Sequence, residues 1–278
     1  MTSTLMIQGT SSGVGKTTLV TALCRIFSDA GYSVAPFKSQ NMSNYSYKEN
    51  GFEIAQAQAI QATAARVNIS PHMNPILLKP LGNYRSTVIL QGKAYKNMTA
   101  NNYYKKFALT KGLKLALESL QILKKRYDLV IMEGAGSPAE INLQKYDIAN
   151  MLLAQKTRSP VLLVADIEKG GSFASIVGTM SLLPRDHHML VKGFIINKFR
   201  GDIKILKPSF IKLKQITSKS VFGVIPLVGL NLPNEDSLDN KIHLFKKENK
   251  KKLEYEIDKL AKTVKANLDV KKIERLLK

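Results

Sequence analysis

Residues 9–18, GTSSGVGKTT, combine a glycine-rich turn with a lysine and two threonines in a spacing that can hold phosphate. They follow the apolar run at residues 5–7 and lead into a helical pattern, so they are predicted to form a loop between a strand and a helix. Backbone N–H groups can converge there on an anion, Lys16 can reach the β/γ-phosphates, and the Thr17 hydroxyl can bind Mg²⁺. The residues predicted to contact the nucleotide in this loop are Gly9, Ser12, Gly13, Val14, Gly15, Lys16, Thr17 and Thr18.

The spacing inside this loop is unusual. Five residues separate Gly9 from Gly15, whereas the common phosphate-binding loop has four before its Gly-Lys pair. The tail GVGKTT also matches the loop of partition-type ATPases, but their signature lysine would fall at Ser11. A purely structural Gly/Ser turn is the alternative to a nucleotide site.

A carboxylate follows another predicted strand, DLVIME, at residues 128–133. Asp128 begins this strand and Glu133 ends it, so the two lie about 16 Å apart at about 3.3 Å per residue. Only Glu133 can therefore lie beside the phosphates, and we expect it to hold Mg²⁺ directly or through water. The structural alternative is a glutamate that caps a helix in a glycine turn.

Two further charged residues follow the second predicted strand at residues 33–37. Lys38 comes directly after it and could neutralise both a γ-phosphate and an incoming carboxylate; a solvated lysine is the alternative. Glu53 is predicted to open an Ala/Gln-rich helix at residues 53–66, where a carboxylate would favour the helix dipole on structural grounds alone.

The elements that position these residues alternate between strands and helices. Short apolar runs bounded by turn signals predict six strands at residues 5–8, 33–37, 128–133, 161–166, 192–197 and 221–225. This alternation indicates an α/β fold of the P-loop NTPase type, a mostly parallel sheet with helices on both faces and ligands at the carboxyl ends of the strands. A long amphipathic helix is predicted at residues 103–126, and NPILLKP and STVILQG before it suggest an added hairpin.

Composition is ordinary for one large α/β core. The 278 residues are 44% hydrophobic and 23% charged. No apolar run approaches the roughly 20 residues that span a bilayer, so we expect a cytoplasmic protein without a membrane partner. The single cysteine, Cys24, falls in the helix after the glycine-rich loop, where it is expected to pack as a small apolar residue and not to act as a nucleophile.

The net charge of +21 raises the question of nucleic-acid binding. Residues 239–278 carry 13 Lys and Arg against 7 Asp and Glu, so most of the excess is spread over the rest of the chain. Because no recognition motif accompanies it, we expect a lysine-rich surface that favours anionic substrates and no nucleic-acid partner.

The last predicted helix has one apolar face, formed by Leu253, Ile257, Leu260 and Val264. We expect this face to pack on the core, and a surface that docks a partner is the alternative.

Several further segments occur in an order that identifies a family resemblance. PFKSQNMSN, EIAQAQAIQA, MNPILLKP, EGAGSPAEINL, DIANM, ADIEKGGSFASIVGT and GFIINKFRGD, together with the glycine-rich loop, resemble the synthetase portion of cobyric acid synthases from about residue 5 to residue 238. That family belongs with dethiobiotin synthetase, whose loop also has five residues before Gly-Lys.

The resemblance implies ATP-dependent amidation of corrinoid carboxylates, from adenosylcobyrinic acid a,c-diamide to cobyric acid by four amide formations. A carboxylate would attack the γ-phosphorus, and ammonia would displace phosphate from the acyl phosphate. Lys16 and Lys38 would be the catalytic residues, because they and Mg²⁺ would offset the charge of two anions brought together.

The resemblance also implies roles for individual residues. By analogy with the dethiobiotin synthetase metal site, Thr17, Glu53 and Glu133 would surround Mg²⁺, and Asn197 would contact the purine. Residues expected to face the corrinoid or to shape its cleft also match family motifs. They are Asn41, Ser137, Glu140, Asn142, Asp147 and the loop at residues 166–171, which begins with Asp166.

The expected layout is a synthetase domain at residues 1–240 and a lysine-rich helical extension at residues 241–278. Cobyric acid synthases generally continue into a glutaminase domain, which we do not expect in this chain. The ammonia would then come from a separate glutaminase subunit or from solution. Because relatives in the superfamily often dimerise across the substrate cleft, the resemblance is compatible with a homodimer.

Two rival functions remain. A partition-type ATPase switch is disfavoured by Ser11 and by the SPAEINL and DIANM segments. An amidase of the cobyrinic acid a,c-diamide synthase type would usually have an Asp-rich segment after its second strand, where this chain has SQNMSN.

Overall fold

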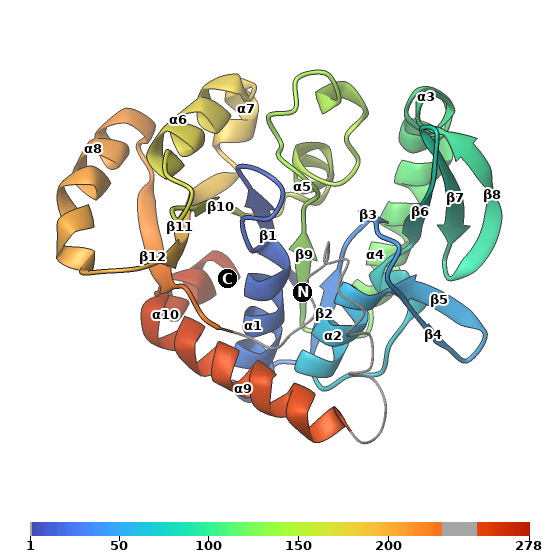
Figure 1. Cartoon of the computed structure of the whole chain (residues 1–278), viewed down its shortest axis with the longest axis horizontal. Helices are drawn as coiled ribbons and strands as arrows, with labels where there is room; N and C mark the ends of the chain where they lie inside the picture. The colour runs from blue at the N-terminus through green and yellow to red at the C-terminus, as the bar shows by residue number, and fades with distance from the viewer. Residues whose placement is uncertain (1, 230–248) are drawn as a thin grey trace.

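A computed structural model describes residues 2–229 and 249–278. Its centre is a parallel sheet of six strands in the order β12-β11-β10-β1-β9-β2 (Figure 1). The strands are β1 (Ser3–Gly9), β2 (Val34–Phe37), β9 (Leu129–Glu133), β10 (Val161–Asp166), β11 (Val191–Phe199) and β12 (Ser220–Pro226). All six predicted strands are confirmed, and their parallel pairing brings their carboxyl ends to one edge.

Helices cover both faces of this sheet, as predicted. Successive side chains of β1 point to opposite faces of the sheet, so both faces carry apolar residues that helices must cover. Leu5 and Ile7 pack into one hydrophobic core, whereas Met6 packs into the other. The first core is closed by α1 (Lys16–Asp29), α2 (Gln56–Ala64), α9 (Lys250–Asn267) and α10 (Val270–Leu276). The second is closed mainly by α4 (Leu113–Lys124), α5 (Met151–Thr157), α6 (Ser172–Leu182) and α8 (Lys207–Thr217), with α7 (Arg185–His188) after α6.

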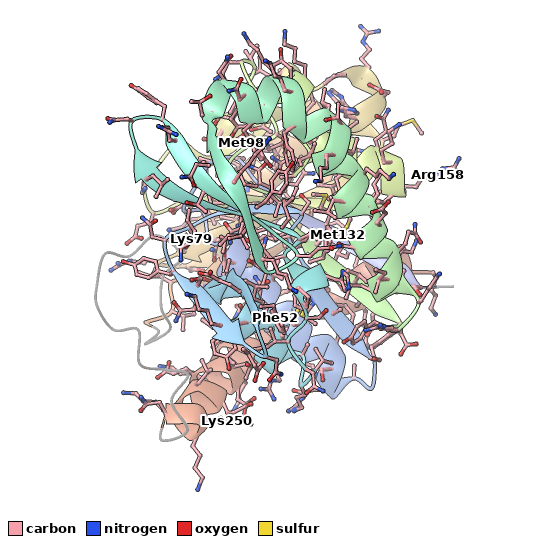
Figure 2. The ribbon with its side chains drawn as sticks, turned by 90° about the vertical axis from the view of Figure 1, so that its right-hand side faces the viewer. Phe52, Lys79, Met98, Met132, Arg158 and Lys250 are labelled. Atoms are coloured by element: carbon pink, nitrogen blue, oxygen red, sulfur yellow. The ribbon has the colours of Figure 1, made fainter. Side chains whose placement is uncertain are left out.

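A smaller sheet lies beside the central one (Figure 1). Its order is β3-β6-β7-β8, from β3 (Gln40–Met42), β6 (Ile76–Gly82), β7 (Arg85–Leu90) and β8 (Lys93–Thr99). The antiparallel β6–β7 pair confirms the suggested hairpin, whereas β3 and β8 were not predicted. Figure 2 faces this side of the molecule, and its labels on Lys79 and Met98 mark β6 and β8.

The predicted helix at residues 53–66 is wrong in its first turn. Its first residues lie on β5 (Phe52–Ala55), which forms a hairpin with β4 (Ser46–Glu49), and α2 starts only at Gln56. Asn50 and Gly51 have φ of 47° and 78°, which suits a two-residue turn whose central residues both need positive φ. The Asn-Gly turn therefore decides the local structure, and Glu53 lies on a strand.

The predicted helix at residues 103–126 differs in its winding. It consists of α3 (Ala100–Asn102), a π-helical segment η2 (Tyr103–Gly112) and α4. Tyr103 and Phe107 of η2 pack against Ile76 and Val88 of the small sheet. The segment thus joins the two sheets. Short 3-10 turns, which complete the described elements, are η1 (Pro71–Met73), η3 (Gln144–Tyr146) and η4 (Ile203–Leu206).

The last helices belong to the first core. Leu253, Ile257, Leu260 and Val264 of α9 are all buried against α1, in agreement with the predicted apolar face. The predicted boundary at residue 240 lies outside the described residues. Within residues 2–229 and 249–278, no helix is both long and apolar enough to cross a bilayer.

Candidate active site

The glycine-rich loop joins β1 to α1 at the carboxyl edge of the sheet. A Cβ atom on Gly9 would lie 2.5 Å from Cγ2 of Val14, so the loop has no room for a side chain there. Gly15 precedes α1 with φ of 96°, and a Cβ on it would lie 2.1 Å from Nδ2 of Asn197. These contacts explain the two glycines and leave the N-terminal N–H groups of α1 facing the loop.

Lys16 spans this loop. Its Nζ donates to the backbone oxygen of Ser11 at 3.0 Å and to that of Gly136 at 2.9 Å. Gly136 belongs to the EGAGS turn after β9, so the ammonium group joins two loops at the strand ends. Such a position places a positive charge where the terminal phosphates of a nucleotide would lie.

Glu133 is the centre of the buried polar cluster. Its side chain is fully buried at the end of β9, and β9 pairs with β1 so that Glu133 lies opposite Ile7. Oε1 accepts a hydrogen bond from the Thr17 hydroxyl at 2.7 Å and from Nζ of Lys38 at 2.8 Å. The structure therefore brings together the predicted pair Thr17 and Glu133 with the predicted catalytic Lys38.

Gln61 completes the hydrogen bonding of Glu133 and was not predicted as a site residue. Its Nε2 lies 2.6 Å from Oε2 of Glu133, and Gln61 itself is fully buried on α2. Buried polar side chains in an Ala-rich helix are a signal in the sequence, since an amide there requires a partner. Which partner it finds depends on the packing of α2 against α1 and β2.

The amide cluster extends to Asn41 on β3. Nδ2 of Asn41 donates to Oε1 of Gln58 at 3.0 Å, and Nε2 of Gln58 lies 3.4 Å from Oε1 of Gln61. All three side chains are buried. Asn41, predicted to face the substrate, is therefore linked through two glutamines to Glu133.

Glu53 lies in a separate cluster. Oε1 accepts a hydrogen bond from Nζ of Lys79 at 2.7 Å and another from the Ser46 hydroxyl, while Nζ of Lys48 lies 4.0 Å from Oε2. Burial raises the pKa of Glu53, but the hydrogen bonds from Lys79 and Ser46 outweigh it and hold that pKa below its usual value. In the structure Glu53 is thus held by Lys79 and Ser46, whereas Thr17 and Glu133 are joined to each other by a hydrogen bond.

The loop after β9 carries four predicted substrate residues. Ser137 is buried and its hydroxyl accepts from the backbone N–H of Ala139, whereas Glu140 and Asn142 are exposed. Asp147 closes the loop by accepting from the backbone N–H groups of Ala149 and Asn150 and from Nδ2 of Asn150. Burial raises the pKa of Asp147, and these hydrogen bonds oppose the rise.

Asp166 lies beside the glycine-rich loop. Its Oδ2 accepts from Nζ of Lys198 at 2.8 Å, and the same ammonium donates to the backbone oxygen of Gly13 at 2.8 Å. Asp166 was expected to face the substrate, but its observed contact is with a lysine that supports the phosphate loop. Lys198 was not predicted, although it directly follows Asn197.

Asn197 also contacts the loop, because its Nδ2 donates to the backbone oxygen of Val14 at 2.8 Å. A pocket of about 330 Å³ opens at this point, between the start of α1 and the ends of β11 and β12. Its lining includes Gly15, Thr18 and Asn197. Ser12 lies exposed at the loop tip.

The oxygens of Thr17 and Glu133, which lie within hydrogen-bond distance of each other, could serve as metal donors. Within residues 2–229 and 249–278, no group of three or more His, Cys, Asp and Glu side chains could hold a metal ion. One hydroxyl and one carboxylate fit Mg²⁺, which is usually bound through one or two carboxylates, substrate phosphates and water. Cys24 contributes nothing here, since it is fully buried and burial raises the pKa of its thiol.

Comparison with known proteins gives a consistent result. Residues 5–235 match the family model described as the CobQ/CobB/MinD/ParA nucleotide binding domain. The chain is 54% identical over 240 residues to a cobyric acid synthase of Caldanaerobacter subterraneus subsp. tengcongensis, covering 86% of this chain and 47% of that protein. It is 53% identical over 242 residues to a probable cobyric acid synthase of Thermococcus kodakarensis, covering 86% and 49%.

The chain thus spans about half the length of the curated relatives that it matches. Among solved structures, the cell division protein MinD of Aquifex aeolicus is similar with a TM-score of 0.44 and 14% identity, covering 81% of this chain and 82% of that one.

Proposed function

Because the chain belongs to the CobQ/CobB/MinD/ParA nucleotide binding domain family and has the α/β fold of P-loop NTPases, we propose that it is the synthetase part of a cobyric acid synthase. It would use ATP to amidate corrinoid carboxylates, converting adenosylcobyrinic acid a,c-diamide to cobyric acid. The observation that carries this proposal is the buried cluster in which Glu133 holds Thr17 and Lys38, next to the loop spanned by Lys16.

The proposed reaction has two steps. A carboxylate oxygen of the corrinoid attacks the γ-phosphorus of ATP, the bond from that phosphorus to the bridging oxygen breaks, and ADP leaves. Ammonia then attacks the acyl carbon, loses a proton, and phosphate leaves with the electron pair of the broken C–O bond. No protein nucleophile is required, so the enzyme acts by positioning two anions and compensating their charge.

Residues of the cluster have distinct proposed roles. Lys16 binds the β/γ-phosphates, exchanging its backbone contacts for phosphate oxygens. Lys38 is buried, so its charge is poorly screened by water and can attract the incoming carboxylate toward the γ-phosphate. Lys38 directly follows β2, and Lys16 is the first residue of α1.

Thr17 and Glu133 are the proposed Mg²⁺ residues, and the ion would neutralise charge on the phosphates. Glu53, whose Oε1 pairs with Lys79, is proposed as the third residue around the ion. Asn197 is proposed to contact the purine, and Asn41, Ser137, Glu140, Asn142 and Asp147 to face the corrinoid or shape its cleft. Asp166 is proposed to act through Lys198 on the phosphate loop.

The ammonia donor is the remaining partner. We propose that ammonia reaches this site from a glutaminase subunit or as free ammonium. A homodimer across the substrate cleft is proposed as the assembly.

The test is mass spectrometry of adenosylcobyrinic acid a,c-diamide after incubation with purified protein, ATP, Mg²⁺ and ammonium. Four successive carboxyl-to-amide changes are expected, each lowering the mass by about 1 Da. ATP hydrolysis without any amidated corrinoid, even with a competent glutaminase and glutamine, would overturn the proposal. Stimulation of that hydrolysis by DNA would instead favour an ATPase switch, and amidation of cobyrinic acid alone would favour an a,c-diamide synthase.

A further inference from the structure

Lys38 lies where the chain passes from the central sheet to the smaller one. β2 ends at Phe37 and β3 begins at Gln40, so two residues join strands of different sheets. Lys38 is 3% exposed and lies in neither strand. Backbone N–H and C=O groups that are buried outside a sheet need partners from another part of the chain. The partners of Lys38 therefore show what fixes its position.

The last residue of η1 and the residue after it hold both backbone groups of Lys38. The N–H of Lys38 donates to the carbonyl oxygen of Met73 at 2.9 Å, and Nδ2 of Asn74 donates to the carbonyl oxygen of Lys38 at 3.0 Å. Met73 is fully buried in the second core, and Asn74 is 1% exposed. One short buried segment thus fixes the backbone of Lys38 on both sides.

The Asn74 side chain also holds two other segments of the chain. Nδ2 donates to the carbonyl oxygen of Ile76 at 3.0 Å, and Oδ1 accepts from the backbone N–H of Ala55 at 3.1 Å. Ala55 ends β5 and Ile76 begins β6, so the amide joins both strands to Lys38. This arrangement requires two donors and an acceptor on one short side chain. An amide has them, whereas a carboxylate has no donor and a hydroxyl has only one.

The Lys38 ammonium group reaches its partner from this anchored backbone. Its Nζ lies 2.8 Å from Oε1 of Glu133, and the two side chains are 4% and 0% exposed. A shift of about 1 Å at this distance is enough to exceed the range of a hydrogen bond. The direction of the ammonium group therefore depends on the contacts that hold the backbone of Lys38.

We infer that Asn74 is a positioning residue, which holds the backbone of Lys38 so that the Lys38 ammonium lies beside the γ-phosphate of bound ATP. Asn74 acts through Lys38, because the hydrogen bonds of its own side chain go to backbone groups. A correctly placed ammonium favours ATP over ADP, which has no γ-phosphate. This inference rests on the proposed function in so far as Lys38 lies beside the γ-phosphate, whatever substrate is amidated.

The test measures dissociation constants for ADP and for the non-hydrolysable ATP analogue AMPPNP, both with Mg²⁺. The variants are Lys38→Met, Asn74→Leu and the two combined. Ser119→Ala is the matched control, since the Ser119 hydroxyl is fully buried and lies 3.3 Å from Nδ1 of His72 in η1 and 3.2 Å from Nε2 of Gln91. It removes buried hydrogen bonds beside the same turn without touching Lys38. Thermal unfolding of each variant reports the loss of stability.

Lys38→Met and Asn74→Leu are each expected to weaken AMPPNP binding about 10-fold and ADP binding by less than about twofold, since a hydrogen bond to a charged group carries an effect of this size. The double variant should bind AMPPNP within about twofold of Lys38→Met, because Asn74 has no ammonium left to position. Ser119→Ala should change neither constant by more than about twofold. Should Asn74→Leu not fold, Asn74→Asp keeps the size and the oxygen that accepts from Ala55 but loses the amide donors.

Three results would overturn the inference: wild-type preference for AMPPNP over ADP in the Asn74 variant, equal losses for both nucleotides, or a double variant whose loss is the product of the single losses. The last would show that Asn74 acts independently of Lys38. If the binding results are as expected but the wild-type protein never amidates a corrinoid, only the proposed function is overturned.

Discussion

Nε2 of Gln61 lies 2.6 Å from Oε2 of Glu133. Thr17 and Lys38 both donate to the other carboxylate oxygen, Oε1, so the uncharged amide of Gln61 holds Oε2. Helix α2 thereby fixes the orientation of a buried charge on the neighbouring strand β9. Groups that orient a catalytic or metal-binding carboxylate in this way usually affect activity without contacting the substrate.

Gln61→Leu is the first predicted change, because it keeps the size of the side chain and removes the donor. We expect amidation to fall about 10- to 100-fold and the Mg²⁺ concentration for half-maximal activity to rise. Activity titrated against Mg²⁺ with saturating ATP measures both. Thr63→Val is the matched control on α2, since the Thr63 hydroxyl contacts only the backbone oxygen of Ala59 among the described residues; an equal loss in the control would contradict the positioning role.

Glu133→Gln should lower ammonium-supported amidation by more than about 100-fold, because it removes the buried negative charge between Thr17 and Lys38. Added Mg²⁺ should not restore it. Asp128→Asn is the control, since Asp128 directly precedes β9, at the end of the strand opposite to Glu133, and accepts a hydrogen bond from the backbone N–H of Ser33. Near-normal turnover of Glu133→Gln would overturn the proposed role.

Lys16→Ala should abolish measurable amidation and weaken ATP binding, because the ammonium between Ser11 and Gly136 is the proposed phosphate contact. Turnover and ATP dissociation constants measure the two effects separately. Lys114→Ala, at an exposed lysine paired with Glu118 on α4, should change neither. ATP binding as tight as in the wild type would exclude the phosphate contact.

Glu53→Gln should change stability in a pH-dependent way. Because the pKa of Glu53 is lower in the folded protein than its usual 4.5, its ion pair with Lys79 stabilises the fold above that pH. The stabilisation is lost as the pH falls from 4.5 through the lower folded pKa. Denaturant unfolding should therefore show a difference of about 1 kcal/mol or less at pH 7 that disappears in acid.

The same variant also tests the predicted metal role of Glu53. As the third residue around the ion, Glu53 should contribute to Mg²⁺ binding, so we expect Glu53→Gln to raise the Mg²⁺ requirement of amidation as strongly as Gln61→Leu. In that case Lys79→Met, which frees Glu53 from its ion pair, would lower the Mg²⁺ requirement below the wild-type value. A requirement left unchanged by Glu53→Gln would instead leave Glu53 with Lys79 and Ser46 alone.

Local patterns were sufficient for the framework of the molecule. The six buried strands and the glycine-rich loop could be predicted because apolar runs and glycine spacing act within a few residues of chain. The Asn50-Gly51 hairpin was equally local, and its positive φ values match a known turn signal that the helix prediction overlooked.

What the sequence by itself determined is thus the order of the six central strands along the chain and the place of the glycine-rich loop between the first of them and its helix. Only the tertiary structure decided that Glu133 meets Gln61 while Glu53 meets Lys79, and that Asp166 reaches Gly13 through Lys198. These partners are separated by tens to hundreds of residues. Their contacts depend on strand order, register and helix packing, which no short stretch of chain contains.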